Sequence, residues 1–132
     1  MNTDPIADFL IRLKNAGYAK RESISVPFSN MKLAIAELLN QKGFIGEIVK
    51  KGKTPATKSL SITLLFDENR APRITDVKRI SKPSRRLYEK SKSITSYKSG
   101  FGMTVLSTPK GIMADMDAKK ENVGGEILFN IW

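Results

Sequence analysis

Residues 44–66 read FIGEIVKKGKTPATKSLSITLLF, and this stretch decides the fold class. Apolar side chains alternate with polar ones in its second part, at Leu60, Ile62, Leu64 and Phe66. That period is typical of a β-strand with one buried face. The first part, residues 44–51, also indicates a strand, and the glycine and proline between the two parts favour a turn. The stretch therefore predicts a β-hairpin.

Two amphipathic helices are predicted before this hairpin. The first spans about residues 4–16, with Pro5 in the first helical position and Gly17 as its stop. The second follows Ser29, its expected cap, and ends at Gly43. Residues 23–27 alternate and predict a short strand between the two helices. The apolar stripes are Ile6, Phe9, Leu10 and Leu13 in the first helix, and Met31, Ala34, Ile35, Leu38 and Leu39 in the second.

The part after the hairpin is strand-rich. Strands are expected at residues 74–80, 87–90, 103–107 and 126–132, and one short helix, capped by Asp115, at residues 114–121. A polar segment, residues 67–72, joins this part to the first. The sequence therefore predicts an α+β fold of two small packed halves. Residues 1–66 form an α-β-α-β-β half, and residues 67–132 form a mostly β half with one short helix, which carries the main binding site.

Positive charge is the strongest feature of the composition. Lys and Arg number 23 against 13 Asp and Glu, which gives a net charge of +10 in 132 residues. A small chain with this charge repels itself, so we expect a polyanionic partner. RNA, DNA and an acidic membrane surface are the candidates.

Cysteine and histidine are absent from the sequence. Disulfides, thiolate and imidazole metal ligands and the commonest general base are therefore missing. The carboxylates of Asp115, Asp117 and Glu121 fit the start of a helix better than a metal site. We expect no enzyme activity, no cofactor, no metal and no small-molecule substrate.

Membrane insertion and secretion are not expected either. No apolar run approaches the roughly 18 residues that span a bilayer, and the start of the chain lacks the pattern of a secretory signal. The expected location is the cytoplasm, with an organelle matrix as the alternative.

A polar tip is predicted between two C-terminal strands. Residues 106–115 read LSTPKGIMAD, and Gly124-Gly125-Glu126 precedes the last strand. The hydroxyls of Ser107 and Thr108 can read a base edge or a 2′-OH, and Gly111 lets backbone N–H groups approach a ligand. A hairpin turn made of turn-favouring residues explains the same pattern equally well.

A basic turn is predicted just before this tip. Residues 78–88 read KRISKPSRRLY, with five cations in nine positions and an aromatic residue after them. Arginine pairs with phosphate bidentately, and Tyr88 can stack on an unpaired base. A solvated turn with Tyr88 partly in the core is the alternative. The net charge favours binding by Lys82, Arg85 and Arg86.

The start of the first helix is a weaker candidate for phosphate binding. The helix start at Thr3, Asp4 and Pro5 offers free backbone N–H groups at the positive end of the helix dipole. Asp4 itself opposes an anion, so a capping role is favoured for it. Arg12 and Asn15 on the exposed face either contact an anion or are simply solvated.

Taken in order along the chain, these motifs resemble the bacterial-type family of small ribosomal subunit protein number eight. The residues that carry the resemblance cover essentially the whole chain. They are Asp4 to Asp8, Arg12, Asn15-Ala16, Val77 to Pro83, Tyr88, Ser107-Thr108, Lys110 to Met113, Asp115, Gly124 to Glu126, and Trp132. Two departures stand out, because Pro109 replaces a family hydroxyl and Ser84-Arg85 replaces a common Gly-Leu.

The resemblance implies a structural constituent of the small ribosomal subunit that binds the central domain of 16S rRNA early and helps to assemble the platform. It implies neighbouring ribosomal proteins as partners and, for many relatives, repression of their own operon mRNA. The main RNA contacts would come from Ser107, Thr108, Lys110 and Gly111, with Tyr88 and Gly124, Gly125 and Glu126 nearby. The first helix and the region of Asn30 and Lys32 would add backbone contacts.

Two other classes of function remain alternatives at this point. Charge alone also permits a DNA-binding or nucleoid protein, although no helix gathers side chains that could read bases. A small enzyme using lysine or carboxylates is disfavoured by the missing histidine.

Overall fold

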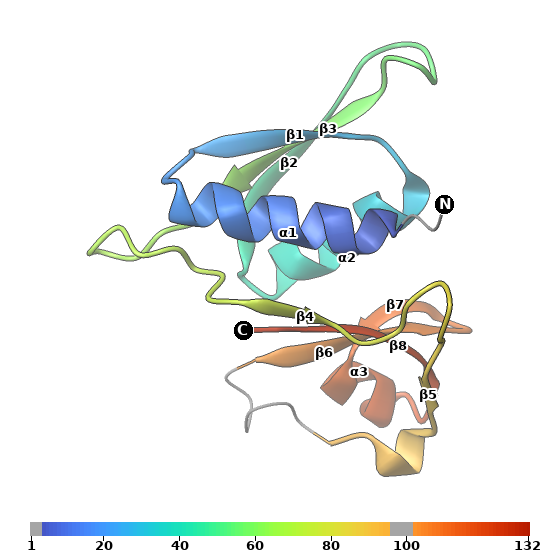
Figure 1. Ribbon diagram of the computed structural model, residues 1–132. Helices are drawn as coiled ribbons and strands as arrows, with labels where there is room; N and C mark the ends of the chain where they lie inside the picture. Colours follow the sequence, from blue (N-terminus) through green and yellow to red (C-terminus); the bar gives the residue numbers. More distant parts are fainter. Residues whose placement is uncertain (1–3, 96–101) are drawn as a thin grey trace. The chain divides into compact units, whose positions relative to one another are not determined.

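The computed structural model describes residues 4–95 and 102–132 (Figure 1). The chain forms two units. The N-terminal unit is Ile6–Thr75, and the C-terminal unit combines the chain start, up to Pro5, with Asp76–Trp132. The α+β class is confirmed, with an α-β-α-β-β order followed by a mostly β part that has one short α-helix.

The N-terminal unit packs helices on a three-stranded antiparallel sheet. Its elements are α1 (Pro5–Tyr18), β1 (Ser23–Pro27), α2 (Asn30–Gln41), β2 (Ile45–Lys51) and β3 (Ser59–Leu64), and the strand order is β1-β3-β2. β2 and β3 form the predicted hairpin. The core is apolar, as the periodicity requires, and includes Phe9, Leu10, Leu13, Ile35, Leu39, Leu60 and Ile62.

The predicted helix ends of this unit are correct at the start of α2 and wrong at the end of α1. The hydroxyl of Ser29 accepts a hydrogen bond from the Lys32 N–H at 3.1 Å, so it is the predicted cap of α2. The prediction that Gly17 stops α1 is wrong, because the helix continues to Tyr18 and Gly17 is buried. A Cβ on Gly17 would lie 3.0 Å from the Cβ of Pro72. This glycine therefore serves close packing, and not a turn.

One residue of the predicted α2 stripe also lies outside the core. Met31 is 40% exposed, whereas Ile35, Leu38 and Leu39 are buried. Met31 belongs to the first turn of α2. A residue at a helix end can satisfy the helical period and still lie beyond the sheet that the helix covers.

The C-terminal unit is a five-stranded antiparallel sheet with one short helix. Its elements are β4 (Val77–Arg79), β5 (Tyr88–Glu89), a 3-10 turn η1 (Ser91–Ser93), β6 (Met103–Thr108), β7 (Gly111–Ala114), α3 (Asp115–Lys120) and β8 (Gly125–Ile131). The strand order is β4-β8-β6-β7, and β5 also pairs with β8. α3 packs against β6 and β7, as Figure 1 shows. The apolar cluster beneath it contains Ile94, Leu106 and Ala118.

Three details of this unit differ from the sequence prediction. β7 was not predicted, because its four residues do not alternate and only pairing with β6 makes them a strand. β4 and β5 are shorter than expected. Asp115 does not cap α3: it is the first helical residue, Ala114 takes the cap position, and the Asp115 carboxylate accepts a hydrogen bond from the Met116 N–H at 2.8 Å. Within the described residues, no helix is long and apolar enough to cross a membrane.

Candidate nucleic-acid interface

An open groove of about 750 Å³ lies in the C-terminal unit, where β5, β6 and β8 meet. Its walls hold several of the predicted binding residues and some that the sequence did not single out. They are Tyr88, Glu89, Lys90, Ser91, Ser107, Thr108, Pro109, Gly124, Gly125 and Glu126. The groove therefore brings Tyr88, the end of the basic turn, beside Ser107 and Thr108 of the polar tip.

The strand register explains why these residues meet. Tyr88 lies opposite Glu126, and Glu126 lies opposite Ser107 on the next strand. Residues directly opposite each other in a sheet point to the same face. The neighbouring Leu106 points to the other face, into the cluster under α3. Tyr88, which is 68% exposed, thus stands on the open face in a row with a carboxylate and a hydroxyl.

Gly124, just before β8, and Gly125, its first residue, allow this row to form. A Cβ on Gly124 would collide with the backbone of Glu89 and Lys90, and one on Gly125 would collide with the backbone of Ser107 and Thr108. A side chain at either position would push apart the strands that form the groove. Both glycines line the groove, but this packing alone is a sufficient reason for their presence.

The turn between β6 and β7 is held by its own residues. The Thr108 hydroxyl donates to the Gly111 carbonyl at 2.8 Å and accepts from the Lys110 N–H at 3.2 Å. Gly111 has φ 115°, a conformation that favours glycine. Pro109, which has no backbone N–H, fits the corner because this position makes no hydrogen bond in the ladder. The Thr108 hydroxyl is thus already engaged, whereas no described side chain bonds that of Ser107.

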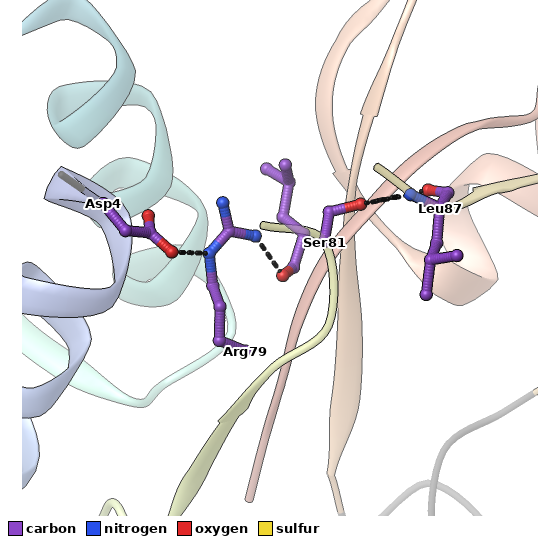
Figure 2. A network of polar contacts seen from close by, with 5 residues as sticks. Asp4, Arg79, Ser81 and Leu87 are labelled. Carbon is purple, nitrogen blue, oxygen red and sulfur yellow. Dashed lines mark hydrogen bonds and ion pairs between the residues drawn. The ribbon is translucent and has the colours of Figure 1, made fainter. Parts of the chain in front are cut away.

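The basic turn is fixed at its base by a buried serine. Ser81 is fully buried, and its hydroxyl accepts from the Leu87 N–H at 2.7 Å (Figure 2). Lys82 and Arg85 exchange two backbone hydrogen bonds, at 2.8 and 3.0 Å, across the turn. Lys82, Arg85 and Arg86 are exposed and do not line the groove, although the chain runs from them directly into Tyr88.

Two charged residues of the predicted motifs bind each other. The Arg79 Nε donates to an Asp4 carboxylate oxygen at 3.0 Å, and the same guanidinium also bonds the Leu128 carbonyl (Figure 2). The two side chains are only 13% and 20% exposed. Arg79 is therefore committed to this pair, and the Asp4 carboxylate is engaged with it. Pro5 is the exposed first residue of α1, and Thr3 lies outside the described residues.

The remaining predicted residues belong to the N-terminal unit. Arg12 and Asn15 line a second groove of about 550 Å³, together with residues of β1. The Arg12 guanidinium donates to the Ser25 carbonyl at 2.8 Å, which fixes its direction. Asn30 and Lys32 lie in the first turn of α2, and the Lys32 ammonium donates to the Pro27 carbonyl at 3.2 Å.

The sequence missed the charged part of the C-terminal groove. Glu89, Lys90 and Ser91 follow Tyr88 directly and line the groove. The sequence signal that could have found them is the polar run directly after this aromatic residue. With Glu126, the walls hold two carboxylates and one ammonium. The cations Lys110, Lys82, Arg85 and Arg86 all lie outside the lining. Lys110 pairs with Glu121 at 3.2 Å, and both side chains are about half exposed, at 54% and 50%.

These groups can bind but have no evident means of catalysis. The groove offers an exposed ring, hydroxyls, carboxylates and one ammonium, which can stack and form hydrogen bonds. Within residues 4–95 and 102–132, no group of carboxylates could hold a metal ion. Fold and site together define a small basic α+β binding protein.

Comparison with known proteins gives the family. The family model described as Ribosomal protein S8 matches residues 4–132. Similar proteins, each named small ribosomal subunit protein uS8, come from Mycoplasmopsis pulmonis, with 48% identity over 98% of this chain and 97% of that protein, and from Roseiflexus castenholzii, with 45% identity over the same shares. The chain therefore belongs to the ribosomal protein S8 family, which confirms the resemblance seen in the sequence and the expectation of a non-enzymatic ribosomal protein.

Proposed function

We propose that this chain is a structural protein of the small ribosomal subunit that binds the central domain of 16S rRNA through the groove beside Tyr88. Membership of the ribosomal protein S8 family supports the assignment to the subunit. The single observation that carries the site is the row of Tyr88, Glu126 and Ser107 on one open face of the sheet. It combines stacking with hydrogen bonding, which irregular RNA can satisfy.

The groove suits unpaired nucleotides better than a regular helix. Tyr88 stacks on a base that has left its helix. Ser107 donates to or accepts from a base edge or a 2′-OH, and the Glu126 carboxylate accepts from an amino group or a 2′-OH. The carboxylates of Glu89 and Glu126 repel phosphate. The groove therefore selects bases and ribose, and a regular A-form helix, whose deep groove is too narrow to read, is a poor ligand.

The cations around the groove supply affinity without selectivity. Lys82, Arg85, Arg86 and Lys110 are exposed near the strand ends that build the groove. Lysine and arginine release counterions when they neutralise phosphates, whatever the base sequence. Phosphate contacts position a protein on nucleic acid, and contacts to bases specify the site. Lys110 would exchange its exposed partner Glu121 for a phosphate at small cost.

The N-terminal unit would add backbone contacts. Arg12 and Asn15 present donors in their groove, and Pro5, Asn30 and Lys32 lie at the starts of the two helices, whose positive dipole ends attract phosphate. Binding by both units would help to fix the platform of the subunit early in assembly, beside neighbouring ribosomal proteins. The expected location is the ribosome in the cytoplasm.

The same groove would serve translational control. An mRNA hairpin with the same irregular, partly unpaired shape would satisfy the row of Tyr88, Glu126 and Ser107 as the rRNA does. Excess protein would then bind its own operon mRNA and repress translation. A transcript of the operon that competes with rRNA for the protein would support this, and a failure to compete at equal RNA concentrations would exclude it.

A filter-binding comparison tests the main proposal. The ligands are a central-domain 16S rRNA fragment, an unrelated structured RNA and duplex DNA, at the same salt concentration. We expect the first to bind at least about a hundredfold more tightly than the others. Equal binding of duplex DNA would favour the nucleoid alternative and overturn the assignment.

A hydroxyl deletion locates the site. Ser107→Ala should weaken cognate binding by about tenfold, since one buried hydrogen bond is lost at the RNA contact, and should leave the unrelated RNA almost unchanged. Ser61→Ala, on β3 of the other unit, is the matched control. Equal losses on both RNAs would move the selective contact away from the groove.

A further inference from the structure

One wall of the groove, the segment that follows Tyr88, has little secondary structure of its own. β5 ends at Glu89, and the 3-10 turn η1 after it has no side-chain hydrogen bond at its start. Lys90 lies between the two elements and lines the groove together with Glu89 and Ser91. A short irregular segment keeps one conformation only when its surroundings hold it. Residues 89–91 are called the Lys90 wall below.

The segment that follows α3 supports this wall from behind. The Ser91 hydroxyl donates a hydrogen bond to the side-chain oxygen of Asn122 at 3.0 Å. Gly124 lies so close to the wall that a Cβ would be 2.4 Å from the Glu89 carbonyl oxygen and 2.9 Å from the Lys90 Cα. α3 and η1 also contact each other (Figure 1). The bond between Ser91 and Asn122 is thus the side-chain link between the wall and the end of α3.

Asn122 has a left-handed backbone conformation, with φ 58°. Its N–H donates to the Lys119 carbonyl at 3.1 Å, and the Val123 N–H donates to the Ala118 carbonyl at 3.0 Å. This pair of bonds ends a helix on one left-handed residue, which is usually glycine and sometimes asparagine. α2 ends with the same pair of bonds on a glycine, Gly43, with φ 82° and open space where a Cβ would lie. The backbone geometry alone therefore does not require a side chain at position 122.

The end of α1 shows that a side chain at such a position can hold another segment. Lys20 has φ 61° there, and its ammonium bonds the Arg70 carbonyl in the loop after β3. Lys20 and Asn122 thus both accept a conformation that favours glycine, and both bind a segment distant in the sequence. For Asn122 that segment is the Lys90 wall. A conformation of this kind persists where the surrounding contacts offset its cost.

We propose that Asn122 is a positioning residue of the RNA site, because through Ser91 it holds the Lys90 ammonium at the groove. The ammonium contacts the phosphate of the nucleotide that stacks on Tyr88. The inference rests on the proposed function for its ligand. Among the described residues, Lys90 is the one cation in the groove lining, and the carboxylates beside it repel phosphate. A phosphate in the groove is therefore attracted to a single point, so the position of Lys90 sets the position of the nucleotide.

A glycine at position 122 separates this role from a purely structural one. In the full-length protein, Asn122→Gly keeps the left-handed backbone and removes the side chain, so the urea midpoint of unfolding should stay the same or rise. Binding of the central-domain rRNA fragment should nevertheless weaken by about fivefold, because one hydrogen bond that orders the wall is lost. Wild-type affinity in Asn122→Gly would overturn the proposal.

Ser93→Ala is the matched control for this variant. Ser93 belongs to the same 3-10 turn but does not line the groove. The control should bind the rRNA fragment as tightly as the wild type does. A loss of affinity equal to that of Asn122→Gly would show that any change near η1 disturbs the site, which would also overturn the proposal.

A double-mutant cycle tests whether Asn122 acts through Lys90. Lys90→Gln alone should weaken rRNA binding and lower the slope of log Kd against log salt, the salt slope, by about 1, since one phosphate contact is lost. In the Lys90→Gln protein, Asn122→Gly should have less than half of the effect on the binding free energy that it has in the wild type. Fully additive effects would show that the two residues act independently, and the positioning role would be refuted.

The same binding assays separate this inference from the proposed function. A wild-type protein that binds the rRNA fragment no better than an unrelated structured RNA refutes the proposed function. If the wild type prefers the rRNA fragment and Asn122→Gly retains that preference in full, only the positioning role of Asn122 is refuted.

Discussion

The groove beside Tyr88 and the lysine cluster, which is Phe28 with Lys50 and Lys58, are each built on one aromatic ring, but the groups around the two rings differ in charge. The groove carries Glu89 and Glu126 against one ammonium, Lys90. The lysine cluster places Lys50 and Lys58 on its ring and has no carboxylate partner among the described residues. One surface can discriminate between ligands by hydrogen bonds, and the other can only attract negative charge.

The exposure of Tyr88 and Phe28 also distinguishes a surface that can select bases from one that attracts negative charge. Tyr88 is 68% exposed on an open face, so a base can stack on it. Phe28 is half-buried, with ammonium groups over it, so its role is to hold cations. An aromatic residue in a basic protein is therefore not enough to predict stacking on a base. The side chains around the ring determine whether a base can reach it.

The largest effect is expected from a glycine that shapes the groove. Gly125→Ala would force a Cβ into the backbone of Ser107 and Thr108, so β6 and β8 must separate. We expect the free energy of unfolding to fall by about 2–3 kcal/mol, as for other overpacked sites. Selective rRNA binding should be lost, while the salt-dependent binding of unrelated RNA remains. Urea unfolding and filter binding measure both, and unchanged selectivity would show that the strand spacing does not define the groove.

A large effect confined to cognate RNA is expected from the exposed ring. Tyr88→Ala removes the stacking surface and should weaken rRNA binding by about 1–3 kcal/mol, or roughly ten- to a hundredfold. Tyr88→Phe keeps the ring and should retain most of the affinity. Binding of unrelated RNA should hardly change in either variant. If Tyr88→Phe loses as much as Tyr88→Ala, the hydroxyl and not the ring makes the contact.

The basic turn should behave like the lysine cluster and unlike the groove. Arg85→Gln with Arg86→Gln should weaken all RNAs to a similar extent and reduce the salt slope by about 2. Ser84→Ala, which changes no charge in the same turn, is the control. A loss seen only with the cognate fragment would place these arginines among the selective contacts.

The smallest effect is expected from the exposed ion pair beside the groove. Glu121→Gln frees Lys110 from its partner at 3.2 Å, and since both side chains are about half exposed the unfolding free energy should change by less than about 1 kcal/mol. RNA binding should tighten slightly at low salt, because Lys110 no longer has to leave a carboxylate. Weaker binding would indicate that Glu121 orients Lys110 for the RNA.

The sequence by itself determined the elements that depend on local spacing. The alternation in residues 59–64, the stripe of Phe9, Leu10 and Leu13, and the cap at Ser29 each arise from side chains a few residues apart, and the structure has them as predicted. The family could also be recognised, because its motifs keep their order along the chain and the family model matches residues 4–132.

Only the tertiary structure decided which side chains share a surface. The row of Tyr88, Glu126 and Ser107 depends on β8 lying between β5 and β6 and on a shift of register between Val105 and Leu106, neither of which has a local signal. The same holds for Gly17, where a Cβ would crowd Pro72, and for Phe28, which meets Lys50 and Lys58 through strand pairing. Local period fixes the direction of a side chain within its own element, whereas its neighbours depend on pairings between distant segments.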